Sequence, residues 1–173
     1  MNLKKKLDMI KRRVWNCTKC GNEYKGMSAC GFGIYEKGKT FFIGMNPWVK
    51  EGEFDYGRGI SILKRYFEEW DYDDFFFDNI VKCQMPGNFK PGTSHADNCR
   101  VHLDAQIHIL EPSKFIIFGS YAARNILGRF PFWEETNFNN TSCYVLPHFS
   151  SILYPNGMRE KIYYKKLKEI VLC

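Results

Sequence analysis

The sequence lacks an apolar run long enough to cross a membrane, and its charged first residues, MNLKKKLDMIKRR, lack the apolar stretch of a secretion signal. It also lacks internal repeats, low-complexity segments and a recognisable linker. These absences argue against a membrane-spanning protein, a secreted precursor, a solenoid and a string of domains. We therefore expect one domain over residues 1–173, located in the cytoplasm and without a membrane partner.

What the sequence does contain is an apolar, aromatic and positively charged composition. Hydrophobic residues make up 45% and aromatic residues 17% of the 173 residues, which suffices for a core and for stacking surfaces. The net charge of +6 favours an anionic partner such as nucleic acid, although many basic proteins bind none. In a reducing compartment, seven cysteines favour metal ligands and buried thiols over disulfides.

Apolar runs and amphipathic segments alternate along the chain. Short apolar runs predict strands at 40–43, 75–81, 115–118 and 144–146. Apolar stripes at helical spacing predict helices at 2–15, 58–70, 94–111, 120–128 and 157–171, the third capped near Ser94 and stopped by Pro112. The Asn-rich residues 129–142 are predicted to form a loop. This alternation predicts a three-layer α/β/α fold around a central, mostly parallel, four-stranded sheet.

Polar side chains lie at the ends of three of the four predicted strands. Asn46 follows the first strand, Asn79 lies near the end of the second, and His148 follows the fourth. Gly119 and Ser120 follow the third strand. Each of these residues, taken alone, is also typical of an ordinary polar turn. Ligands of parallel sheets bind beyond the carboxyl ends of the strands, so together these residues predict one pocket.

Residues 33–40, GIYEKGKT, match the phosphate-loop pattern GxxxxGK[ST]. That pattern needs a strand before it and a helix after it, so that the helix N-terminus faces the phosphates. Here a predicted strand follows instead, and the preceding segment is rich in glycine and cysteine. We interpret the match as a turn, and keep a nucleotidase that depends on Lys39 as a rival hypothesis.

Four cysteines have the spacing of a metal centre. Cys17 and Cys20 form a CxxC pair, and Cys83 and Cys99 flank a loop punctuated by proline and glycine. Four thiolates hold either zinc or an iron–sulfur cluster, and the spacing leaves both open. Cys30 is interpreted as a buried thiol rather than a ligand.

These motifs resemble those of the uracil-DNA glycosylase superfamily, most closely its iron–sulfur branch, family 4. Residues 78–91, DNIVKCQMPGNFKP, are similar to the family's TNVVKCRPPGNRxP, and residues 148–153, HFSSIL, stand where the family has HPSxLL. Residues 43–48, IGMNPW, stand where that branch has GEAPG and are nearer to the GINPG of the thymine/mismatch glycosylases. The resemblance covers nearly the whole chain. It implies a [4Fe-4S] cluster on the four cysteines, with zinc as the alternative, and a monomer whose partner is DNA.

The resemblance also implies a reaction. A monofunctional glycosylase flips a uracil, or a related damaged or modified pyrimidine, out of DNA and hydrolyses its N-glycosidic bond, which starts base excision repair. By position, His148 donates to the O2 of the departing base, Asn79 reads its amide-like edge, and Asn46 places the attacking water. The remaining assignments are Gly44, Met45, Pro47, Trp48 and Ser150 for substrate, with Ser150 on a backbone phosphate, and Lys82, Lys90, Ile152 and Leu153 for DNA, with Ile152 or Leu153 as the wedge.

Three departures from the family pattern widen the possible substrates. The family stacks the flipped base on a Phe of a GxPFVG motif, whereas residues 57–60 here are Gly-Arg-Gly-Ile, so Trp48 or Tyr56 would have to substitute. Met45 replaces an acidic residue and Phe149 replaces a proline. A larger or modified base, or a mismatched thymine, therefore stays open. So does a member of the superfamily that binds nucleic acid without catalysis.

Overall fold

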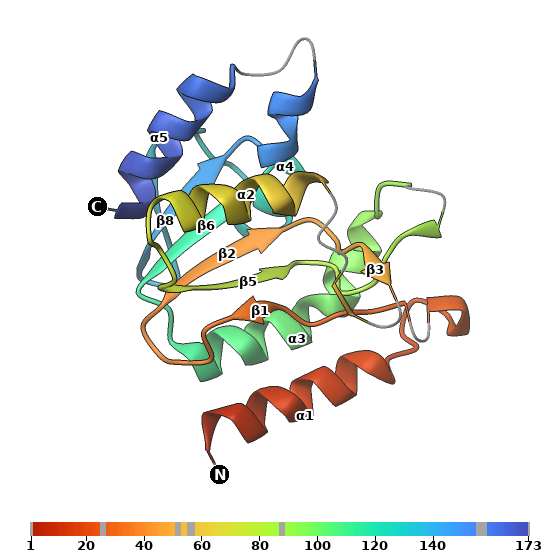
Figure 1. Ribbon diagram of the computed structural model, residues 1–173. Helices are drawn as coiled ribbons and strands as arrows, with labels where there is room; N and C mark the ends of the chain where they lie inside the picture. The colour runs from red at the N-terminus through yellow and green to blue at the C-terminus, as the bar shows by residue number, and fades with distance from the viewer. Residues whose placement is uncertain are drawn as a thin grey trace.

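A six-stranded sheet in the order β1-β5-β2-β6-β8-β7 forms the centre of the molecule (Figure 1). The structure is a computed structural model, and it describes residues 2–24, 27–50, 53–54, 58–86, 89–154 and 159–172. The strands of this sheet are β1 (Phe32–Gly33), β2 (Thr40–Gly44), β5 (Phe75–Asn79), β6 (Lys114–Phe118), β7 (Glu135–Phe138) and β8 (Thr141–Leu146). A separate two-stranded sheet pairs β3 (Val49–Lys50) with β4 (Glu53–Phe54).

The four predicted strands are confirmed as the parallel centre of the sheet, in the order β5-β2-β6-β8. Two short strands that the sequence analysis did not predict, β1 and β7, pair antiparallel to the outer members. The prediction of a loop over residues 129–142 is wrong for β7 and for the first two residues of β8, which are strands. The strand predicted to reach residue 81 ends at Asn79.

Five α-helices cover the two faces of the sheet, as predicted. They are α1 (Leu3–Trp15), α2 (Arg58–Glu69), α3 (Thr93–Leu110), α4 (Ser120–Leu127) and α5 (Glu160–Leu172). The N-cap of α3 is Gly92 rather than Ser94, and its C-cap, Glu111, adopts a left-handed conformation just before Pro112. Within the part of the chain that the structure describes, no helix combines the length with the apolarity that crossing a bilayer requires.

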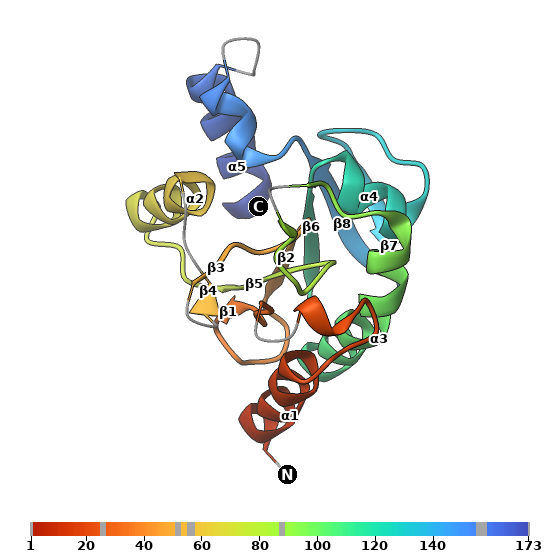
Figure 2. The same cartoon turned by 90° about the vertical axis from the view of Figure 1, so that its right-hand side faces the viewer.

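Side-chain alternation along the strands separates two apolar cores. Phe41, Phe76 and Ile117 face α1, α3 and α4, whereas Phe42 and Phe77 face α2 and α5. Figure 2, a view turned by 90°, shows α2 and α5 on one side of the strands and α1 and α3 on the other. Successive residues of one strand therefore enter chemically different layers, which decides where each functional side chain points.

The phosphate-loop match does not have the structure that phosphate binding requires. Gly33 ends β1 and Thr40 begins β2, so a strand follows the glycine turn, as predicted. Lys39 forms salt bridges with Asp74 at 2.5 Å and Glu36 at 3.4 Å. Its ammonium is thus already paired with two carboxylates, which disfavours the nucleotidase hypothesis.

Candidate active site

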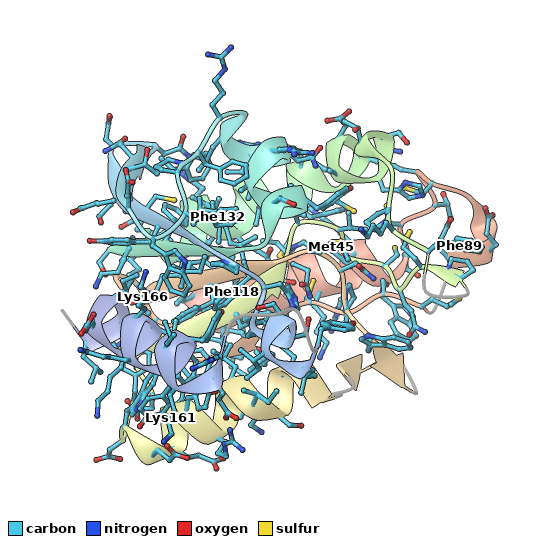
Figure 3. All side chains as sticks on the ribbon, turned by 90° about the horizontal axis from the view of Figure 1, so that it is seen from above. Met45, Phe89, Phe118, Phe132, Lys161 and Lys166 are labelled. Atoms are coloured by element: carbon cyan, nitrogen blue, oxygen red, sulfur yellow. The ribbon has the colours of Figure 1, made fainter. Side chains whose placement is uncertain are left out.

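A cavity of about 780 Å³ lies at the carboxyl ends of the four parallel strands. Figure 3 looks down on this region and shows Met45 and Phe118 between α5, with Lys161 and Lys166, on one side and Phe89 on the other. The predicted site residues that line it are Met45, Asn46, Pro47, Trp48, Asn79, Lys90, His148 and Ser150. Gly119 and Ser120 line it as well. The structure therefore brings together residues that are up to about a hundred positions apart in the sequence.

His148 is held as a neutral imidazole. It follows β8 and caps the short 3₁₀ helix η3 (Phe149–Leu153). Its Nδ1 accepts a hydrogen bond from the Ser150 backbone N–H at 3.2 Å and lies 2.7 Å from the Ser150 hydroxyl. Burial lowers the pKa of His148 to about 4. Because Nδ1 must carry a lone pair to accept from an N–H, the ring proton resides on Nε2, which makes Nε2 a hydrogen-bond donor at neutral pH.

Asn79 ends β5, and its side chain lies over a glycine of the neighbouring strand. A Cβ added to Gly44 would lie 2.4 Å from Asn79 Oδ1 and 3.1 Å from Phe77 Cζ. Only glycine therefore leaves room for the Asn79 amide in this position. The prediction that Gly44 binds substrate is revised by this geometry, because Gly44 is buried behind Asn79 and is not among the cavity-lining residues.

Asn46 lies on the loop after β2, next to Asn79. Its amide nitrogen donates to the Pro47 carbonyl at 3.4 Å, and the side chain is half-buried. Two backbone hydrogen bonds join this loop to the segment after β5, from Ile80 N–H to Gly44 O and from Val81 N–H to Met45 O, each at 3.0 Å. The two asparagines are thus placed by one continuous backbone pairing.

Three phenylalanines, which the sequence analysis did not assign to the site, also line the cavity. Phe149 packs edge-to-face on Phe118, with 5.0 Å between ring centroids, and lies 6.3 Å from Phe77. Its ring is also 4.1 Å from that of His148. Rings in these arrangements attract one another and exclude water. The apolar wall strengthens any hydrogen bond made inside the cavity.

The rim of the cavity carries exposed aromatic and basic side chains. Trp48 is 52% exposed and lines the cavity, as does the exposed Lys90. Tyr56, the other candidate for stacking, lies outside the described residues. Tyr154, which is 66% exposed, is a lining residue that the sequence analysis missed.

The two wedge candidates differ in their surroundings, and neither is among the cavity-lining residues. Ile152 is partly buried and packs against the apolar core beneath α2 and α5. Leu153 is 48% exposed. Leu153 is therefore the one with a side chain available to a duplex.

The prediction that Lys82 contacts DNA is wrong. Lys82 is buried, and its ammonium donates to Asp78 Oδ2, Asn79 O and Gln106 Oε1 at 2.7–2.8 Å. All three of its donors are used inside the protein, so none reaches a phosphate. The sequence shows that Lys82 precedes a cysteine, but it does not show that Gln106 of α3 lies within hydrogen-bond distance of the lysine.

The four predicted cysteine ligands interact with one another. Burial and, after it, the neighbouring thiols of Cys99, Cys20 and Cys17 raise the pKa of Cys83 to about 12. Asn98 donates to Cys20 Sγ at 3.4 Å, which connects the CxxC turn to α3. Within the described ranges, however, no group of three or more His, Cys, Asp or Glu side chains is arranged to hold a metal ion.

This arrangement can be compared with the two cofactors that four cysteines suggest. A single tetrahedral zinc ion, with Zn–S bonds of about 2.3 Å, draws its sulfurs to within about 3.8 Å of each other. In a [4Fe-4S] cluster each cysteine binds a different iron, so the sulfurs stand farther apart. Within the described ranges the four thiols form neither kind of site, so their arrangement does not distinguish zinc from a cluster. Cys30, predicted to be a buried thiol, is only partly buried, and the desolvation of its side chain raises its pKa to about 12.

Comparisons with known proteins agree with the geometry. The family model described as "Uracil DNA glycosylase superfamily" matches residues 31–170. The chain is similar to proteins named "Type-4 uracil-DNA glycosylase" from Sulfurisphaera tokodaii (29% identity over 130 residues, 71% of this chain and 59% of the relative) and Archaeoglobus fulgidus (28% over 130 residues, 72% and 65%). A protein of the same name from Saccharolobus solfataricus is 29% identical over 123 residues, 67% of this chain and 56% of the relative. The matched part thus spans less than two thirds of each relative.

Proposed function

Because the chain belongs to the uracil DNA glycosylase superfamily, we propose that it hydrolyses the N-glycosidic bond of a uracil, or a related damaged or modified pyrimidine, flipped out of DNA. The observation that supports this most is that Asn46, Asn79 and His148, from the ends of three strands, line one cavity. The reaction leaves an abasic site in the DNA and so starts base excision repair.

His148 stabilises the departing base. As the bond to the sugar breaks, negative charge develops on the pyrimidine O2, and the Nε2–H of a neutral imidazole donates to it. A neutral ring with a pKa of about 4 does not transfer a proton to the base at neutral pH. Its contribution is therefore a fixed hydrogen bond inside an apolar cavity, an effect worth roughly 3–4 kcal/mol for comparable donors.

Asn79 selects the base. Its amide offers one donor and one acceptor, which match the O4 acceptor and N3–H donor of uracil. Cytosine presents the opposite pattern on the same edge, so the same amide orientation leaves polar groups unpaired in a buried place. The placement of Oδ1 over Gly44 supports a single orientation.

Asn46 positions the water that attacks the sugar. An amide takes no proton at neutral pH, so Asn46 orients the water without acting as a base. Met45 and Pro47 beside it supply no carboxylate either. The rate therefore depends on electrostatic stabilisation more than on water activation, and we expect a slow enzyme.

DNA lies across the rim. Trp48 stacks on the flipped base: it is aromatic, exposed and in the cavity wall two residues after Asn46, and Tyr154, with the same three properties, is the alternative. Lys90 contacts a backbone phosphate, and Leu153 fills the space that the base leaves. Ser150, predicted to bind a phosphate, has its hydroxyl 2.7 Å from His148 Nδ1, which supports a role in orienting that ring instead.

The four cysteines are proposed to bind a [4Fe-4S] cluster, which the resemblance of their spacing to the iron–sulfur branch supports, although the described residues form no ready metal site. A cluster with four thiolate ligands supplies a structural cross-link and keeps no open position for substrate. Cys17 and Cys20 would hold the N-terminal segment, and Cys83 and Cys99 would hold the segment between them, which ends in the first turns of α3. Iron and sulfide analysis of purified protein tests this, and stoichiometric zinc would contradict it.

One assay tests the proposed activity. Purified protein is incubated with oligonucleotides that each carry one altered base, in single-stranded, paired and mismatched form. We expect free uracil and an abasic site, and loss of both in His148→Ala. Salt-sensitive binding without release of any base would instead support a binding protein on the same scaffold.

A further inference from the structure

A buried network of charged and polar side chains lies directly behind Asn79. Asp78 of β5 is completely buried, and Lys82 and Gln106 are each 1% exposed. Asp78 precedes Asn79, so strand alternation directs its side chain to the α3 side of the sheet while Asn79 faces the cavity. The network thus lies on the opposite face from the proposed base-reading side chain.

Every strong donor of this network has a partner. Lys82 Nζ lies 2.8 Å from Asp78 Oδ2, 2.7 Å from Gln106 Oε1 and 2.7 Å from the Asn79 carbonyl oxygen. Gln106 Nε2 donates to Asp78 Oδ2 at 2.5 Å. An ammonium with three short bonds in a closed interior has one geometry, so its neighbours are fixed with it.

Both backbone groups of Asn79 belong to this network. Its N–H donates to Asp78 Oδ1 at 2.6 Å, and its carbonyl accepts from Lys82. The two peptide units on either side of the Asn79 Cα are therefore held from behind. The direction of the Cα–Cβ bond, and with it the position of the amide in the cavity, follows from those two peptide units.

Stability alone is a weak explanation for such a network. Apolar side chains of similar volume often stabilise a core as well as a buried ion pair does, because desolvating two charges is costly. A second role can be sought in what the network holds, namely the backbone N–H and carbonyl of Asn79.

We propose that Lys82, with Asp78 and Gln106, is a positioning residue that fixes Asn79 for recognition of the base. This deepens the proposed function and rests on it. Lys82 touches no substrate atom; it acts only through the backbone of Asn79.

A double-mutant cycle tests this mode of action. In single-turnover assays on a uracil oligonucleotide, Lys82→Met should lower kcat/KM by about 100-fold, the cost of a misplacement of about 1 Å. In an Asn79→Ala background the same substitution should change kcat/KM by less than about threefold, because the group it positions is gone. An equal loss in both backgrounds overturns the proposal.

Two controls separate positioning from general damage. Leu167→Ala removes a fully buried side chain on the opposite face of the sheet, and it should leave kcat/KM within about threefold at a temperature where both variants are folded. Iron and sulfide content should match the wild type in Lys82→Met, since Lys82 adjoins Cys83. If Lys82→Met does not fold, Asp78→Asn, which keeps an oxygen for the Asn79 N–H but removes the charge, replaces it in the cycle.

A measurement without DNA keeps this proposal separate from the proposed function. Amide hydrogen exchange of Asn79, followed by NMR, should accelerate at least tenfold in Lys82→Met and stay unchanged in Leu167→Ala. If wild-type protein releases no base from any oligonucleotide, the proposed function fails and this exchange result alone decides whether Lys82 fixes Asn79. Unchanged exchange of Asn79 in Lys82→Met overturns the positioning role.

Discussion

The two faces of strand β5 differ in charge. The face toward α3 carries the Asp78–Lys82 ion pair, and the face toward the cavity carries Phe77 and Asn79, which are uncharged. His148, across the cavity, is neutral as well because burial lowers its pKa to about 4. The charged pair Asp78–Lys82 thus lies on the α3 side of the sheet, where it holds the backbone. The uncharged polar groups of Asn79 and His148 lie on the cavity side, where a base would bind.

This separation suits a reaction in which charge appears only in the transition state. A permanent cation beside the base would bind phosphates and other anions in the ground state as well, whereas Lys90, the lysine that lines the cavity, is exposed at its rim. Neutral donors with fixed directions interact weakly with a neutral base and strongly with the anion it becomes. Substitutions on the neutral side of β5 should therefore affect base release directly, whereas those on the charged side should act through the backbone.

Removing the neutral donor should cause the largest loss. His148→Ala should lower kcat for base release by about 10²–10³, with little change in KM, because the hydrogen bond forms fully only in the transition state. Single-turnover release of uracil measures this. His108→Ala, at an exposed histidine of α3, is the matched control and should keep wild-type activity. A similar loss in both variants would contradict the assignment.

Displacing the Asn79 amide on the cavity side of the sheet should cause the second-largest loss of activity. In Gly44→Ala the new Cβ would lie 2.4 Å from Asn79 Oδ1, so the amide must move, and kcat/KM for uracil should fall about 100-fold. Gly92→Ala is the control, since its Cβ would meet nothing nearer than 3.7 Å. Wild-type kcat/KM in Gly44→Ala would show that the amide position is unimportant.

Acid should destabilise the protein through the neutral histidine. The pKa of His148 is about 4 when folded and about 6.5 when unfolded. Between these values the unfolded chain binds a proton that the folded chain does not, so stability is complete above pH 6.5 and falls as the pH drops toward 4. We expect a loss of about 2 kcal/mol between pH 7 and 4.5 from this group. Urea unfolding should show that this part of the loss is absent in His148→Gln; equal losses would contradict it.

Removing the Ser150 hydroxyl beside the His148 ring should have the smallest effect on the rate. Ser150→Ala removes the hydroxyl near Nδ1 but keeps the backbone N–H that also binds it, so kcat should fall by no more than about tenfold. Ser151→Ala is a close control, because the buried Ser151 hydroxyl has no hydrogen-bond partner among the described residues. A Ser150→Ala variant as inactive as His148→Ala would mean that Ser150 has a role of its own in catalysis.

The parallel centre of the fold and the polar ends of its strands were predictable because both follow from local pattern. An apolar run such as FFIG predicts a buried strand, and the carboxyl ends of parallel strands must meet. The edge strand β7, with the sequence ETNF, was missed because it is short, polar and largely exposed. Its pairing with β8, rather than its own residues, makes it a strand.

The site was harder to predict wherever a side chain has two possible environments. Lys82 was assigned to DNA as a basic residue beside the predicted cysteine ligands, and only the fold brings Asp78 and Gln106 to it. Phe77 and Phe118 were read as core, since nothing in a strand pattern says that its last aromatic residue borders a cavity. Phe149 gave a usable signal, an aromatic residue where the family pattern has proline.

The preference for uracil over cytosine should depend on the Asn79 amide, which is proposed to read the edge of the base. Rates of base release are measured for oligonucleotides that differ only in carrying uracil or cytosine at one position, with wild-type protein and with Asn79→Ala. The account predicts that wild-type protein favours uracil by at least about 10⁴-fold and that Asn79→Ala loses most of this preference. A preference that survives intact in Asn79→Ala would contradict it.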